Sequence, residues 1–178
     1  IKNKFFRKIL ELVAGIDMRV KLPVYNSETF TKYFKKNKIP LNIDAPSKNR
    51  KAVIYSTCFV NFNKKETGVS ALKVLKKNGV DVQEAYPGCC GMPFLEQADL
   101  PKVVEQAKKV SKDLLKWVDK GYQIITLTAS CGLMLKFEWP LLLPNDENIK
   151  RLSKSVSDID EYIVDIAQNE GLAEGLQE

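Results

Sequence analysis

Residues 52–58 read AVIYSTC, an apolar run followed at once by a cysteine, and this stretch decides the fold of the chain. A run of this length that is rich in valine, isoleucine and tyrosine is typical of a buried strand. The same order returns twice further along the chain, in VDVQEAYPGCC (80–90) and in YQIITLTASC (122–131). Three strands are therefore predicted, each with cysteine in the loop at its carboxyl end.

Helical patterns fill the segments between these strands. Residues 67–78 predict a helix that is followed by Gly79, and Asp99 is a good N-cap for a long helix that ends at Gly121. Alternating strands and helices predict an α/β fold with a mostly parallel sheet and flanking helices. Because the loops beyond the carboxyl ends of such strands line one crevice, we expect the cysteines to meet at one edge of the sheet.

Extra helices are expected at the N-terminus. Residues 2–13 show apolar side chains at helical spacing, and Ser27 is expected to cap a second short helix that carries Phe30. The first of these helices has four basic residues: Lys2, Lys4, Arg7 and Lys8. Three roles are open to it, namely packing on its own domain, contact with an anionic membrane surface, and contact with a partner subunit.

The C-terminal part is expected to be helical as well. Cys131 is predicted to open a short helix that reaches Phe137, the stretch Pro140–Pro144 to break the chain, and residues 159–166 to form a final amphipathic helix. Three parts follow from these patterns: an N-terminal helical segment and linker (1–50), a cysteine-rich domain (51–170) and a flexible tail (171–178).

Composition indicates a protein of a reducing compartment. Four cysteines in 178 residues are too few for a secreted disulfide scaffold, and no apolar run approaches the about 20 residues that span a bilayer. The net charge is +6, but the lysines alternate with acidic residues along the helices, so we expect no nucleic-acid binding. We expect a cytoplasmic protein whose contact with the inner face of the cell membrane is at most peripheral. Because it opens on Ile1, we also expect a piece of a longer chain.

The cysteines indicate a metal centre. The chain has no histidine, so thiolates are the strongest ligands available, and they favour iron-sulfur clusters or zinc. No C-x-x-C is present, so only the fold can bring the cysteines together. Metal ligation is the leading interpretation for four residues: Cys58, Cys89, Cys90 and Cys131.

Two alternatives to metal ligation stay open. Cys89 and Cys90 could act in thiol-disulfide exchange, although adjacent Cα atoms only about 3.8 Å apart disfavour an ordinary disulfide. The thiols could also be inert, because a free cysteine often serves as a small buried apolar residue. Gly88 and Gly91 favour ligation, since glycine allows the backbone to come close to a cluster.

Three blocks of the sequence resemble a known family: STCFVNFN (56–63), GCCGMPFLEQADL (88–100) and GYQIITLTASCGLMLKFEWPLLLP (121–144). Their cysteine pattern resembles the cysteine-rich "CCG" domain found in the B subunit of heterodisulfide reductase and in related glycolate, lactate and succinate oxidoreductases. In detail the blocks are more similar to the C subunits of anaerobic glycerol-3-phosphate dehydrogenases. The resemblance covers about residues 20–165.

The resemblance implies a non-catalytic electron-transfer subunit with an iron-sulfur cluster. Such a subunit takes electrons from a flavin dehydrogenase, such as glycerol-3-phosphate dehydrogenase, and passes them to a membrane quinone or a disulfide. In the family's full motif the last cysteine belongs to a C-x-x-C pair, whose first member is here Thr128. The chain thus offers four thiolates where the noncubane clusters of the reductase use five. Four thiolates suit a [4Fe-4S] cluster and equally a tetrahedral zinc ion, which would make a structural domain that docks on a partner or a membrane.

Overall fold

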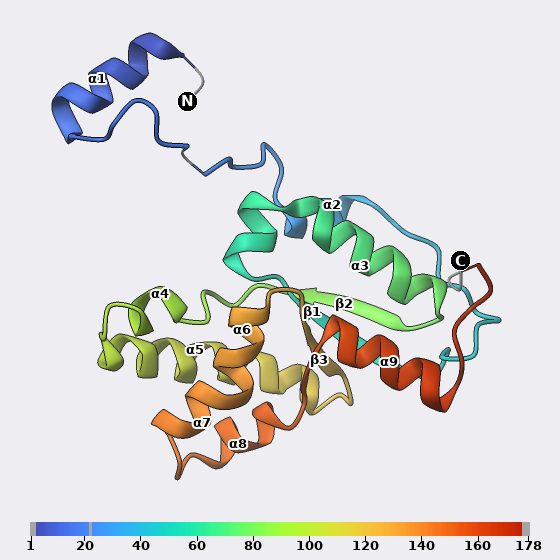
Figure 1. Ribbon diagram of the computed structural model, residues 1–178. Helices are drawn as coiled ribbons and strands as arrows, with labels where there is room; N and C mark the ends of the chain where they lie inside the picture. Colours follow the sequence, from blue (N-terminus) through green and yellow to red (C-terminus); the bar gives the residue numbers. More distant parts are fainter. Residues whose placement is uncertain (1–2, 22, 176–178) are drawn as a thin grey trace.

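A four-stranded, all-parallel sheet forms the centre of the computed structural model, which describes residues 3–21 and 23–175 (Figure 1). The strand order is β2-β1-β3-β4. The strands are β1 (Lys51–Tyr55), β2 (Asp81–Ala85), β3 (Gln123–Thr126) and β4 (Val156–Asp158). The predicted α/β class is therefore confirmed. The fourth strand was not predicted, because its three residues, VSD, have no apolar run.

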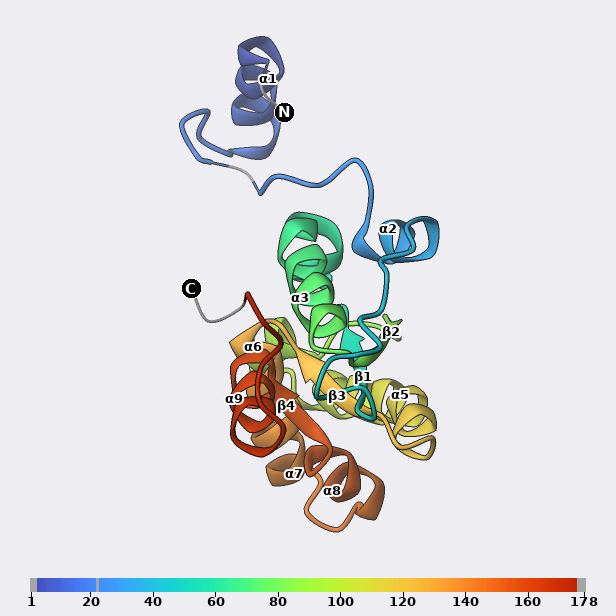
Figure 2. The ribbon, with the colours of Figure 1, turned by 90° about the vertical axis from the view of Figure 1, so that its right-hand side faces the viewer.

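Helices cover both faces of the sheet (Figures 1 and 2). One face packs against α3 (Lys65–Lys77) and α9 (Ile159–Asn169), and the other against α5 (Leu100–Val118) and α8 (Glu147–Ser153). Successive residues of a strand point to opposite faces. Accordingly, Ala52 and Ile54 belong to the first core, whereas Val53 and Tyr55 belong to the second, and all four are buried.

Short helical segments connect these layers. They are α2 (Phe30–Lys36), η1 (Phe59–Asn63), α4 (Met92–Leu95), α6 (Ala129–Leu133), η2 (Met134–Glu138) and α7 (Trp139–Leu142). The two segments η1 and η2 are wide π-type turns, which are rare and often found at functional sites. Both follow a cysteine of the sequence pattern, so the backbone is irregular next to the predicted site.

The N-terminal helix α1 (Lys4–Ala14) lies apart from the sheet (Figures 1 and 2). None of its residues is buried, so packing on its own domain, one of the three roles open to this helix, is not observed. Lys2, which the sequence pattern includes in this helix, lies outside the described residues. The prediction that Ser27 caps α2 was wrong: the cap is Thr29, whose side chain accepts a hydrogen bond from the Lys32 amide at 3.2 Å.

The region after the last cysteine also differs from the prediction. The helix begins at Ala129, two residues before Cys131, and it continues through η2 into α7. Pro140 does not break it: Pro140 is the second residue of α7 and follows directly on the wide π-type turn η2. Helix α8 was not predicted either. Its N-cap is Asp146, which accepts hydrogen bonds from two backbone amides.

The C-terminal residues described after α9 contact the domain. Ala173 is buried, and its backbone N–H donates to Asn78 Oδ1 at 3.0 Å. This part of the expected flexible tail is therefore packed, while residues 176–178 lie outside the described residues. Within the described ranges, no helix is long and apolar enough to cross a membrane.

Candidate metal centre

The structure places the four predicted cysteines at one edge of the sheet. Cys58 follows β1, Cys89 and Cys90 follow β2, and Cys131 follows β3 within α6. These three strands are parallel neighbours in the order β2-β1-β3, so their carboxyl ends lie side by side. Cysteines separated by 73 positions in the sequence, from 58 to 131, are thereby brought together. Whether they bind metal remains a prediction.

The four cysteines follow one another in a row. Cys90 Sγ donates to Cys131 Sγ at 3.2 Å, and Cys58 and Cys90 both lie close enough to Cys89 to affect the pKa of its thiol. All four cysteines are free. Cys90 and Cys131 are buried, whereas Cys58 and Cys89 are partly exposed. The row therefore has a buried end and an end that reaches the surface.

Mutual hydrogen bonding divides the thiols into donors and acceptors. The pKa of Cys89 is lowered because its sulfur accepts hydrogen bonds from Cys58 and Cys90, and the pKa of Cys131 is lowered chiefly by the bond from Cys90. The same bonds, together with burial, raise the pKa values of Cys58 and Cys90. Hydrogen bonding of this kind stabilises the thiolate of the accepting cysteine, and the thiolate is the form of cysteine that binds metals.

Backbone geometry shapes the loop that carries the cysteine pair. Gly88 and Gly91 have φ angles of 147° and 90°, which glycine adopts without strain. The Gly91 amide donates to Cys89 Sγ at 3.4 Å. The positive φ angles expected of these glycines are therefore present, and a close approach of the backbone to a cluster remains a prediction.

Two aromatic side chains that sequence reasoning missed also contact this loop. The Tyr55 hydroxyl donates to the Gly88 carbonyl at 2.8 Å, and Trp139 Nε1 donates to the Cys90 carbonyl at 3.1 Å. The signal in the sequence is weak: a buried tyrosine or tryptophan needs a partner for its polar atom, but the sequence does not say which one.

Thr128, which stands where the resembled motif has a further cysteine, borders the site. It is the N-cap of α6, and its hydroxyl lies 3.1 Å from the Thr57 hydroxyl. Thr57 is fully buried, and its hydrogen bond contributes to lowering the pKa of Cys131. A hydroxyl pair therefore occupies the place next to Cys131 where a fifth thiol would be expected.

The donor set fits a sulfur-liking centre, because the groups that form the row are all thiols. In the described part of the chain, no three or more His, Cys, Asp or Glu side chains are arranged to hold a single metal ion. The sulfurs of Cys90 and Cys131, 3.2 Å apart, are closer than the about 3.8 Å between sulfurs that share a tetrahedral zinc with Zn–S bonds of about 2.3 Å. The two sulfurs must therefore move apart to bind a zinc ion or an iron-sulfur cluster. An iron-sulfur cluster spreads its thiolates over several irons, so it does not require them to converge on one point.

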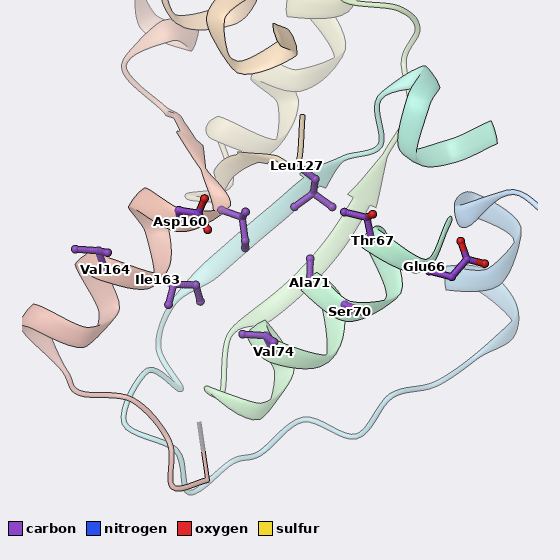
Figure 3. Close-up of a pocket in the computed structure, with 10 residues that line it drawn as sticks. Glu66, Thr67, Ser70, Ala71, Val74, Leu127, Asp160, Ile163 and Val164 are labelled. Atoms are coloured by element: carbon purple, nitrogen blue, oxygen red, sulfur yellow. The ribbon is translucent and has the colours of Figure 1, made fainter. Parts of the chain in front are cut away.

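A cavity of about 670 Å³ lies elsewhere, between α3 and α9. Figure 3 shows side chains of the two helices facing each other across it, among them Ala71, Val74 and Ile163. Its lining is mostly apolar, and no cysteine contributes to it. It is therefore separate from the thiol site.

The part of the chain that carries the four cysteines is similar to known proteins. Residues 52–136 match the model of a family described as "CCG: Cysteine-rich domain". This stretch contains all four cysteines. No solved structure matches significantly.

Several curated proteins are similar to the chain. The C subunit of anaerobic glycerol-3-phosphate dehydrogenase from Escherichia coli (strain K12) is 30% identical over 142 residues, which cover 79% of this chain and 35% of that protein. Lactate utilization protein A of Geobacillus sp. (strain WCH70) is 26% identical over 133 residues, 71% of this chain and 53% of that protein. The B subunit of fumarate reductase (CoM/CoB) from Methanothermobacter marburgensis is 29% identical over 114 residues, 62% of this chain and 20% of that protein. The chain thus spans about a fifth to a half of the length of these relatives.

Proposed function

Because residues 52–136 belong to the cysteine-rich CCG domain family, we propose that this chain is part of an iron-sulfur electron-transfer subunit of an oxidoreductase complex. The observation that carries the proposal is the row of four thiols at one sheet edge. Relatives named as subunits of a dehydrogenase and of a reductase support it. In the finer form of the proposal, electrons come from a flavin dehydrogenase, such as glycerol-3-phosphate dehydrogenase, and go to a quinone or a disulfide.

The residues of the site divide into ligands and surroundings. Cys58, Cys89, Cys90 and Cys131 would hold the cluster, a [4Fe-4S] centre in our proposal, which would supply reversible one-electron storage. Burial of Cys90 and Cys131 excludes water from one side. The partly exposed Cys58 and Cys89 leave the other side accessible, so this is the side at which we expect electrons to enter and leave.

Metal analysis tests the proposal directly. Protein purified without oxygen should be brown, with broad visible absorption, and should contain about four iron and four sulfide per chain. The reason is that a cluster ligated by four cysteines needs no donor beyond the thiols of the row. A colourless protein with one zinc per chain would instead support the structural zinc domain.

We also propose a cytoplasmic location with peripheral contact at the membrane through α1. This helix exposes Phe5 and Leu12, at 68% and 88%, beside Lys4 and Lys8. Exposed apolar side chains next to basic residues are typical of helices that lie on anionic membrane surfaces. A partner subunit is the alternative occupant of this face.

Vesicle binding distinguishes these two occupants. The protein should sediment with anionic vesicles more than with neutral ones, and Leu12→Glu should weaken this binding by about tenfold, because it adds a charge to the apolar face. Leu141→Glu is the matched control, since Leu141 is also exposed, at 73%, but lies in α7. Equal binding by both variants, or none by the wild type, would argue against membrane contact through α1.

A further inference from the structure

The loop that carries Cys89 and Cys90 is held from two sides by buried aromatic donors. Tyr55 comes from β1 and bonds the carbonyl before the pair, that of Gly88, at 2.8 Å. Trp139 comes from α7 and bonds the carbonyl of Cys90 itself at 3.1 Å. Both aromatic side chains have no exposed surface. The loop backbone is thus tied to the sheet and to the helical layer at once.

These hydrogen bonds matter because their acceptors have little access to water. If the donor is removed, the buried carbonyl has neither a protein partner nor water. The loss in stability is then larger than the net contribution of the hydrogen bond, because the desolvation penalty of the carbonyl is no longer compensated. Cys90 is only 2% exposed, and its carbonyl is the one that Trp139 bonds. The loop would therefore open more readily without the indole.

The π-type turn η2 directly precedes Trp139. An extra residue in a helical turn rotates everything after it by about 100° relative to a regular helix. Such turns occur frequently at functional sites. In this chain the irregular turn sets the direction from which the indole reaches the cysteine loop.

We propose that Trp139 is a positioning residue for the thiol site, which fixes the backbone of Cys89 and Cys90 in its ligating conformation before metal binds. Trp139 lies outside the residues matched by the family model, 52–136. The proposal rests on the proposed function for the identity of the bound centre. The fixing of the loop backbone by Trp139, in contrast, is a property of the metal-free protein and can be measured on metal-free protein.

The test uses the two tryptophans of the chain as a matched pair. Trp139→Phe keeps the aromatic ring but removes the indole donor. Trp117→Phe makes the same change in α5, where Trp117 packs edge-on against Tyr122 at a centroid distance of 5.4 Å. Tyr122 precedes β3, so this control lies at the amino edge of the sheet, opposite to the cysteines.

Thiol alkylation of metal-free protein, followed residue by residue with mass spectrometry, gives the readout. Trp139→Phe should increase the alkylation rate of Cys90 by about tenfold relative to that of Cys131, because the loop opens locally. Trp117→Phe should leave this ratio unchanged. Equal acceleration of both cysteines in Trp139→Phe would indicate a general loss of stability and would overturn the proposal. If Trp139→Phe does not fold, Tyr55→Phe provides the same test at the Gly88 carbonyl.

A second measurement on metal-loaded protein separates this proposal from the proposed function. A chelator should remove the metal about tenfold faster from Trp139→Phe than from Trp117→Phe. If wild-type protein binds no metal, the proposed function fails. The ratio of the Cys90 and Cys131 alkylation rates then still tests whether Trp139 holds the cysteine loop in place. If metal is bound but the two variants give equal alkylation ratios and equal release rates, the positioning role is rejected and the proposed function stands.

Discussion

Protein in which Cys90 is replaced by serine is expected to lose nearly all of its bound metal. The Cys90 sulfur is buried and lies next to Cys131 in the middle of the thiol row. Serine offers a hard hydroxyl in place of a soft thiolate. Groups that merely support a ligand change metal affinity by about 10- to 100-fold, so loss of the ligand itself should cost more. Metal content after desalting, measured per folded chain, is the quantity to compare.

Serine at Cys58, Cys89 or Cys131 should have the same direction of effect, since each removes one of four ligands. Thr128→Ser is the matched control, because it keeps the hydroxyl that contacts Thr57. It should retain full metal content. If Cys131→Ser kept both its metal content and its spectrum, Cys131 would not be a ligand. The inference that thiols following three different strands share one centre would then be wrong.

The placement of the thiols could be predicted because the apolar runs that end in cysteine and the alternation of strands with helices indicate the same fold. Each of the runs at 52–58, 80–90 and 122–131 ends in cysteine, and alternating helices require parallel strands. Cysteines at the carboxyl ends of such strands must then share an edge. Strand β4 and helix α8 gave no comparable signal, because β4 has three residues and α8 is only seven residues long.

The groups around the thiols could not be predicted in the same way. Tyr55 was interpreted as an apolar strand residue, which it is, but its hydroxyl meets a carbonyl 33 residues away. Trp139 lies 49 residues from Cys90, and its direction depends on a π-type turn that no sequence pattern indicates. Such contacts follow from tertiary packing. They become visible only when the strands and helices are in place.

Removing the metal from wild-type protein is expected to lower the melting temperature by about 10 °C. A ligand present at about 1,000 times its dissociation constant stabilises the folded state by about 4 kcal/mol. For a chain of this size, each kcal/mol shifts the melting temperature by about 2–4 °C. The metal-free protein should nevertheless stay folded, because the two apolar layers on either side of the sheet form largely without the cysteines.

Calorimetry before and after chelation, with metal content verified in each sample, measures this shift. The double variant Cys58→Ser, Cys90→Ser provides the control: it should bind no metal, so the chelator should leave its melting temperature unchanged. Because metal binding is coupled to the folded state, the loss should be largest at the carboxyl edge of the sheet. Hydrogen exchange should therefore rise in the loops after β1, β2 and β3 and stay unchanged in the middle of α5. Identical melting of loaded and metal-free wild-type protein would mean that the thiol row holds no metal that stabilises the fold.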